Sequence, residues 1–246
     1  MPAGAGSLVL DVRAKDFPGR PPRAVLRDVR LTVARHEVVA LVGPSGCGKT
    51  TLLTLVAGLD DRFEGTITRP EGRLAMVFQN PRLLPWRTLG DNLALALPTD
   101  TPDLDARIDA ALDAVGLAGR RNSFPNHLSL GQQRRAAVAR AFVVEPELLL
   151  LDEPFVSLDE ATADRLRALL RTLLERRPAT VLLVTHDLRE AIALADRIVF
   201  LAGTPATVVD DVRITLPDRT EATVEAFRRM LLERQAQSTP SRTHGS

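Results

Sequence analysis

Residues 43–51, GPSGCGKTT, have the types and spacing needed to hold a phosphate anion. They follow the apolar run VVALV (38–42) and precede an apolar helical segment. The glycines let backbone N–H groups curl around the anion, Lys49 supplies a cation, and the Thr50 hydroxyl can ligate Mg²⁺. A glycine-rich turn without a ligand is disfavoured because both flanks fit the motif. This phosphate loop assigns to nucleotide binding Gly43, Pro44, Ser45, Gly46, Cys47, Gly48, Lys49, Thr50 and Thr51.

A carboxylate pair follows a second apolar run in LLLLDEP (148–154). Four leucines predict a buried strand, so Asp152 falls at its end, where it can hold Mg²⁺ through the water shell of the ion. Glu153 projects in another direction and can orient or deprotonate an attacking water. Alone, such a pair is most often a polar strand terminus. Beside a phosphate loop, it is predicted to be catalytic.

Two further polar residues follow predicted strands. Gln79 comes after LAMVF (74–78) and is expected to contact Mg²⁺ or the nucleophilic water. His186 comes after TVLLVT (180–185) and is expected to donate to the γ-phosphate. A single Gln or His at a strand end is usually only a polar terminus. The hypothesis depends on position, because parallel strands collect ligands at their carboxyl ends.

The segment LSLGQ (128–132), here called the signature segment, begins a basic helix. Ser129 suits the N-cap position, and the helix is predicted to run from Leu130 through Arg140. The positive end of a helix favours an anion. The segment nevertheless lies far from the phosphate loop in sequence, so an ordinary capped helix is the simpler interpretation when it is considered alone.

The elements that must position these residues alternate between strands and helices, which predicts a mainly parallel sheet. Between Asn80 and Val144 the strands give way to helical periodicity. There Leu104, Ile108, Leu112 and Val115 form one apolar stripe, closed by Gly116. The region therefore reads as a helical insert. Past His186, the helix LREAIALAD and the strands RIVFL and ATVVD are expected.

Composition excludes several classes of protein. A formal net charge of +1 over 246 residues argues against a nucleic-acid binder that neutralises many phosphates. The single cysteine, Cys47, excludes an internal disulfide. No apolar run approaches the roughly 18 residues that span a bilayer, and the N-terminus lacks the pattern of a signal peptide. A cytoplasmic chain is therefore expected.

The motifs together resemble those of the ATP-binding cassette (ABC) ATPases over nearly the whole chain. The matching elements, in order, are GPSGCGKTT, Gln79, LSLGQ, LLLLDEP, SLD (157–159) and the His of VTHD. The resemblance implies an α/β P-loop NTPase fold with a mainly parallel core sheet, an N-terminal antiparallel β region and an inserted α-helical subdomain. It also implies ATP and Mg²⁺ as ligands, with Thr50, Gln79 and Asp152 at the metal and Glu153, His186 and Gln79 in catalysis.

The resemblance further implies a division of the chain. A single ATPase domain is expected over 1–234, with a nucleotide-binding core, a helical subdomain, a C-terminal helix and a disordered tail. The predicted ranges are 1–80 and 145–215 for the core, 81–144 for the helical subdomain, 220–234 for the helix and 235–246 for the tail.

Members of this family pack two cassettes head to tail, which implies a second copy of this chain as partner. Ser129, Gly131 and Gln132 would then act on the ATP held by the phosphate loop of the other copy, and Asp159 would line the interface. Leu130 replaces a glycine of the usual signature. It is expected to occupy the first helical position, which any L-residue can adopt. Two other departures are His36, which replaces a glycine and tolerates positive φ, and Phe17, which takes the adenine-stacking role because the chain lacks tyrosine.

The segments QNPRLLPWRTLGDNL, DEPFVSLD and THDLREAIALADRI resemble importers of the nitrate, sulfonate and taurine group. That likeness implies an ATPase at the cytoplasmic face of the bacterial inner membrane, a transmembrane permease and a periplasmic or surface solute-binding protein. The permease is expected to dock on Leu83, Leu84, Pro85 and Trp86, here called the docking segment. The alternative places Trp86 in the core.

Other P-loop proteins fit less well. A P-loop kinase would lack the signature segment and His186. A DNA-repair ABC ATPase would carry a long coiled coil between phosphate loop and signature, where this chain has only about 80 residues. A translation-factor ABC protein would carry two cassettes. A regulatory ABC ATPase outside transport remains the alternative to an importer.

Overall fold

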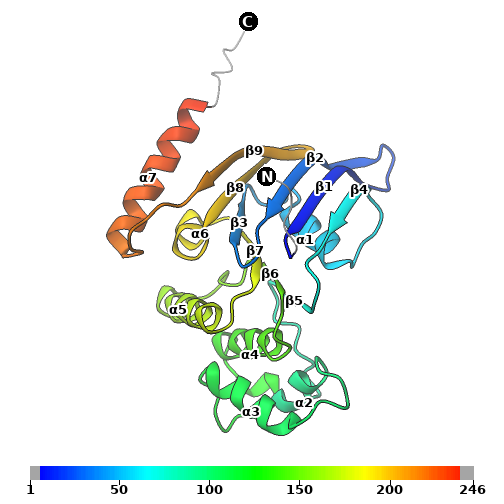
Figure 1. Cartoon of the computed structure of the whole chain (residues 1–246), viewed down its shortest axis with the longest axis vertical. Coiled ribbons are helices and arrows are strands. Elements are labelled where there is room, and N and C mark those ends of the chain that lie inside the picture. The colour runs from blue at the N-terminus through cyan, green and yellow to red at the C-terminus, as the bar shows by residue number, and fades with distance from the viewer. Residues whose placement is uncertain (1–5, 239–246) are drawn as a thin grey trace, which may run out of the picture.

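Nine strands form one sheet in the order β4-β1-β2-β9-β8-β3-β7-β6-β5, in a computed structural model that describes residues 6–238 (Figure 1). Its parallel part runs from β8 to β5, as predicted for the core. Two predicted strands, 38–42 and 180–185, have the predicted ends. The parallel strands are β3 Val38–Val42, β5 Leu74–Val77, β6 Leu148–Asp152, β7 Thr180–Thr185 and β8 Arg197–Gly203.

The antiparallel part of the sheet is built mainly from the N-terminal region. Strand β1 (Leu8–Phe17) pairs antiparallel with β2 (Arg23–Val33) and with β4 (Glu64–Thr68). Strand β9 (Ala206–Arg213) returns antiparallel beside β8. It meets β2 only at the pairing of Leu26 with Ala206. The N-terminal antiparallel region expected from the resemblance is thereby confirmed.

The parallel strands are mainly apolar because both faces of the sheet are covered. On β6, Leu148 and Leu150 face the core shared with α1 (Lys49–Ala57) and the N-terminal strands. Leu149 and Leu151 face the opposite core, shared with α5 (Glu160–Arg176) and α6 (Leu188–Leu194). The four consecutive leucines therefore serve two hydrophobic cores, two residues each.

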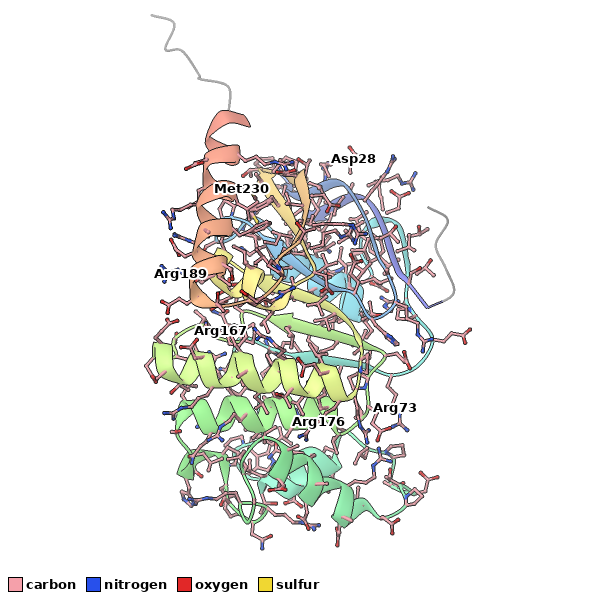
Figure 2. The ribbon with its side chains drawn as sticks, turned by 60° about the vertical axis from the view of Figure 1, so that its left-hand side comes forward. Asp28, Arg73, Arg167, Arg176, Arg189 and Met230 are labelled. Carbon is pink, nitrogen blue, oxygen red and sulfur yellow. The ribbon has the colours of Figure 1, made fainter. Side chains whose placement is uncertain are left out.

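The helical insert contains α2 (Leu89–Ala94), α3 (Leu104–Ala114) and α4 (Leu130–Phe142). The α3 stripe packs into the core as predicted. Helix α4 continues two residues beyond the predicted end, because Ala141 and Phe142 are buried. Figure 2 shows α5, then α4, then α2 and α3 in successive layers, so α4 lies between the sheet and the rest of the insert.

The last element of the described residues is α7 (Glu221–Ser238), which lies along the sheet domain, away from the helical insert (Figure 1). Arg189 of α6, labelled in Figure 2, pairs with Glu225 of α7 at 3.1 Å. Helix α7 runs past the boundary at 234, and residues 239–246 of the predicted tail lie outside the described residues. Within residues 6–238, no helix is long and apolar enough to cross a membrane.

Gly65 of β4 is expected to tolerate no side chain. Its φ is +130°, and an added Cβ would lie 1.9 Å from the Asp11 carbonyl oxygen. Gly65→Ala should therefore lower the free energy of unfolding by about 3 kcal/mol or more. Gly119→Ala is the control: its φ is +71° with nothing within 4 Å, so only about 1–2 kcal/mol of backbone strain is expected. Urea unfolding followed by circular dichroism measures both, and equal losses would contradict the steric argument.

Candidate functional site

The phosphate loop joins the end of β3 to the first turn of α1. Gly48 caps the helix with φ +116°, and an added Cβ would lie 2.9 Å from side-chain atoms of Val25 and Leu26. The buried ammonium of Lys49 donates to the carbonyl oxygens of Gly43 (2.8 Å) and Pro44 (2.9 Å). The loop thus holds its own cation at the helix N-terminus, where the backbone already favours an anion.

A cavity of about 340 Å³ opens beside this loop and collects residues from distant parts of the chain. Its volume falls within the usual range for small-molecule sites. Phe17 and most residues of the phosphate loop, all predicted to bind ATP, line this cavity. The lining is Phe17, Arg23, Val25, Ser45, Gly46, Gly48, Lys49, Thr50, Thr51, Gln79 and Glu153.

Thr50 and Asp152 form an oxygen-rich pair next to the loop. The Thr50 hydroxyl donates to Asp152 Oδ1 at 2.9 Å. Burial raises the pKa of Asp152, and the Thr50 hydrogen bond opposes that shift. In residues 6–238, no group of three or more His, Cys, Asp or Glu side chains could hold a metal. A hydroxyl and one carboxylate suit Mg²⁺, which keeps several waters and binds phosphate oxygens.

Glu153 and His186 lie at the ends of the adjacent strands β6 and β7. Glu153 Oε2 is 3.5 Å from His186 Nδ1. The Glu153 backbone has φ +43° and donates its N–H to the Val184 carbonyl at 2.9 Å. A left-handed conformation is uncommon for such a residue, and here it turns the chain directly after Asp152. Gln79 follows β5. Gln79, Glu153 and His186 therefore lie at the edge formed by the carboxyl ends of the parallel strands, as expected.

Arg134 of α4 is a contact that sequence reasoning missed. Its guanidinium is buried and donates to the carbonyls of Pro154 (2.9 Å) and Val156 (2.6 Å), with a longer contact to that of Glu153 (3.5 Å). The helix that follows Ser129 is therefore tied to the turn that carries Glu153. The only sequence signal was the pair of consecutive arginines in QQRR. Adjacent residues of a helix point in different directions, so one of the two can face the protein interior.

The signature segment forms a second, separate cavity. Ser129 caps α4: its Oγ accepts the Gln132 N–H (3.3 Å), while Gln132 Oε1 accepts the Ser129 N–H (2.9 Å). Leu130 is the first helical residue, as predicted, and its side chain is exposed. This cavity of about 670 Å³ is also lined by Gly131 and Asp159, and Asp159 caps α5. The signature residues do not line the phosphate cavity of their own chain.

Comparison with known proteins decides the family. A family model described as "ABC transporter" matches residues 26–156. The chain belongs to the ABC transporter family. It is an ATPase that binds ATP together with Mg²⁺, the activity and ligands that the motifs predicted.

Among relatives of this ABC ATPase are proteins named "Aliphatic sulfonates import ATP-binding protein SsuB 2". The protein from Burkholderia cenocepacia (strain HI2424) is 42% identical over 242 residues, covering 94% of this chain and 88% of that protein. The one from Pseudomonas savastanoi pv. phaseolicola (strain 1448A / Race 6) is 47% identical over 214 residues, covering 86% and 78%.

Among solved structures, the dimeric ATP-binding cassette MJ0796, in a post-hydrolysis state bound to ADP and Pi, aligns with a TM-score of 0.75. It is 28% identical and covers 85% of this chain and 99% of that chain.

Asp152→Asn is expected to stabilise the protein at pH 7 by about 1 kcal/mol while weakening Mg²⁺-dependent ATP binding. Burial raises the pKa of Asp152 in the folded state, so its charge disfavours folding at neutral pH. That penalty is absent well below the unfolded pKa of about 4. Asparagine keeps an oxygen that can accept the Thr50 hydroxyl.

Urea unfolding at pH 7 and pH 3, without nucleotide or Mg²⁺, measures the difference. The free energy of unfolding of Asp152→Asn should exceed that of the unchanged chain at pH 7, and this difference should shrink at pH 3. Asp61→Asn, at an exposed carboxylate, is the matched control and should change neither stability nor ATP binding. A loss of stability at pH 7 in Asp152→Asn would mean that the hydrogen bond to the charged carboxylate outweighs its burial.

Proposed function

We propose that this chain is the ATP-hydrolysing subunit of a bacterial importer and that two copies act head to tail. The observation that carries the proposal is the separation of the two cavities. One is lined by the phosphate loop, Gln79 and Glu153, and the other is lined by the signature segment. Each is half of an ATP site, and a second copy of the chain supplies the complementary half.

Within one half, residues in and beside the phosphate cavity divide the chemistry. Lys49 and the loop N–H groups hold the phosphates. Thr50, Gln79 and Asp152 would hold Mg²⁺, and the ion would supply positive charge next to the phosphate oxygens. Glu153 orients or deprotonates the attacking water, and its neighbour His186 donates to the γ-phosphate. Phe17, which also lines the cavity, stacks on adenine.

The other half is the exposed end of α4. The Ser129 hydroxyl and the Gly131 N–H are the donors toward the partner's γ-phosphate. Gln132 fixes the first turn through the reciprocal cap, and Asp159 lines the interface from the start of α5. Leu130 projects from the first helical position and leaves both donors in place. Its substitution for glycine is therefore compatible with a working signature.

The docking segment supports a permease partner. Trp86 is 70% exposed, which excludes the alternative of a core tryptophan. Its loop is held from beneath by the buried Asn92, whose amide donates to the carbonyls of Leu84 (3.2 Å) and Arg87 (3.2 Å) and whose Oδ1 accepts the Leu84 N–H (2.7 Å). An exposed aromatic side chain on a well-fixed loop suits the binding of a partner helix.

The solute and the setting follow from the relatives. Their names assign them to the import of aliphatic sulfonates, and we propose the same solute class here. The chain then lies peripherally on the cytoplasmic face of the membrane and works with a permease and a solute-binding protein. We also propose the division into a nucleotide-binding core (1–80 and 145–215) and a helical subdomain (81–144), with the subdomain contacting the permease.

Mixed dimers test the ATPase mechanism. One mixture pairs a Glu153→Gln chain with a Ser129→Arg chain, so one site carries both changes and the other carries neither. The second pairs a doubly substituted chain with an unchanged chain, so each site carries one change. The first should keep up to half of the activity, and the second should lose roughly 100-fold, because general-base and charge-stabilising groups each contribute about that much.

Steady-state ATP hydrolysis by separately tagged, co-purified chains gives the readout. Each single variant alone should bind ATP but hydrolyse it poorly, which controls for folding. If the doubly substituted mixture is the more active, the signature segment and the phosphate loop act within one chain and the head-to-tail proposal is wrong.

Trp86→Ala tests both the proposed permease docking and the proposed solute class. It should weaken recruitment to membranes that contain the partner permease at least tenfold, because a buried Trp anchor often contributes about 2 kcal/mol. Uptake of an alkanesulfonate by cells that depend on this gene should fall with it. The thermal transition and the ATPase activity of the purified chain should stay unchanged.

Leu59→Ala, at another exposed apolar residue, is the control and should leave recruitment and uptake intact. Unchanged recruitment in Trp86→Ala would contradict the docking role of Trp86. Failure of the unchanged chain to bind permease-containing membranes would argue for the alternative, a regulatory ATPase outside transport. Normal recruitment to the membrane without alkanesulfonate uptake by the unchanged chain would contradict only the solute class.

A further inference from the structure

The chain has only two lysines, Lys15 and Lys49. Lysine and arginine together number 32, and all but Lys15 and Lys49 are arginine. Lys49 belongs to the phosphate loop. Lys15 lies on β1, two residues before Phe17, and is only 1% exposed. The mechanism above gives no role to this buried cation.

Three neighbours surround the Lys15 ammonium. It donates to Asp60 Oδ2 at 2.7 Å and to the Arg62 carbonyl at 2.8 Å. It also lies 4.8 Å from the centroid of the Phe17 ring. A cation that leaves water must be paired and hydrogen-bonded, and the face of an aromatic ring adds electrostatic attraction. A compact ammonium meets these neighbours, whereas a guanidinium would present five donors in a rigid plane.

An irregularity in β1 turns Lys15 inward. The pairing of β1 with β4 shifts register between Val12 and Ala14. Val12 and Lys15 are both buried as a result, and Arg13 between them is exposed. Simple alternation from Val12 would have placed Ala14 inside instead.

The acceptors of Lys15 connect it to the phosphate loop. Asp60 and Arg62 follow the C-cap of α1, Gly58, and the first residue of α1 is Lys49. Helix α1 shares a hydrophobic core with β1, and the two lie on the same side of the molecule (Figure 1). Nine helical residues therefore separate the phosphate-binding end from the segment that anchors Lys15 beneath Phe17.

We propose that Lys15 is a positioning residue for the nucleotide base. Its ammonium holds the Phe17 ring from one side and fixes it to the end of α1, so that the ring presents its other side to adenine at a set distance from the phosphate loop. The inference rests on the proposed role of Phe17 in the ATP site. Lys15 touches neither the phosphates nor the reacting atoms, so it acts on base binding alone.

The test compares a nucleotide with the same charged group lacking a base. Isothermal titration measures the affinity of the full chain for the ATP analogue AMP-PNP and for inorganic tripolyphosphate, both with Mg²⁺. Lys15→Met should weaken AMP-PNP binding about tenfold and leave tripolyphosphate binding unchanged. Asp60→Asn keeps Lys15 but weakens its anchor, so it should lower the ratio of AMP-PNP affinity to tripolyphosphate affinity by a smaller factor. This variant replaces Lys15→Met in the test if Lys15→Met does not fold.

Two further variants separate the outcomes. Arg27→Met removes an exposed ion pair with Asp16 on the neighbouring strand and should leave the ratio unchanged. Phe17→Ala should lower AMP-PNP affinity at least as much as Lys15→Met. Two outcomes overturn the role of Lys15 alone. In one, Lys15→Met weakens the binding of AMP-PNP and of tripolyphosphate equally. In the other, Phe17→Ala lowers the ratio of AMP-PNP affinity to tripolyphosphate affinity, but neither Lys15→Met nor Asp60→Asn changes it. An unchanged ratio in Phe17→Ala overturns the role of Phe17 and this proposal together.

Discussion

The hydrogen bond from Thr50 to Asp152 is the interaction on which the site depends. It joins residues 102 positions apart in the chain, across β7, which lies between β3 and β6 in the sheet. Burial disfavours the Asp152 charge, and the hydroxyl compensates only in part. A buried carboxylate of this kind is suited to a cation, because a metal ion replaces the solvation that folding removed.

The rest of the fold holds the two ends of this bond in place. Leucines on both faces of β6 fix the position of Asp152 between two hydrophobic cores. Helix α1 begins at the phosphate loop and ends beside the segment that anchors Lys15, so one rigid element spans the proposed distance from phosphate to base. The two lysines of the chain stand at the points where a compact cation is needed.

Arg134 physically links the elements that line the two cavities. The signature end of α4 faces one cavity, and the guanidinium of Arg134, one turn further on, binds the carbonyls after Glu153, which faces the other cavity. In the proposed head-to-tail dimer, a shift of α4 would therefore pull on the turn that carries Glu153 of the same chain. Tightly packed elements transmit such shifts because close-packed interiors have little slack.

The sequence by itself determined the chemistry and the order of the elements. Glycine spacing, the lysine and threonine of the phosphate loop, and the acidic residues after four leucines each predict local structure, because backbone geometry and strand burial are local properties. The position of Leu130 as first helical residue followed in the same way from the cap at Ser129. His36 was expected to tolerate positive φ, and it has φ +62°.

Only the tertiary structure decided which distant groups meet. The burial of Lys15 depends on a register shift against β4, and the contacts of Arg134 depend on how α4 packs under the sheet; neither leaves a periodic signal in the sequence. The exposure of Trp86 was likewise open, because an apolar residue in a loop can face either the core or solvent until its neighbours are placed. Contacts across the fold are set by packing, and packing is a property of the whole chain.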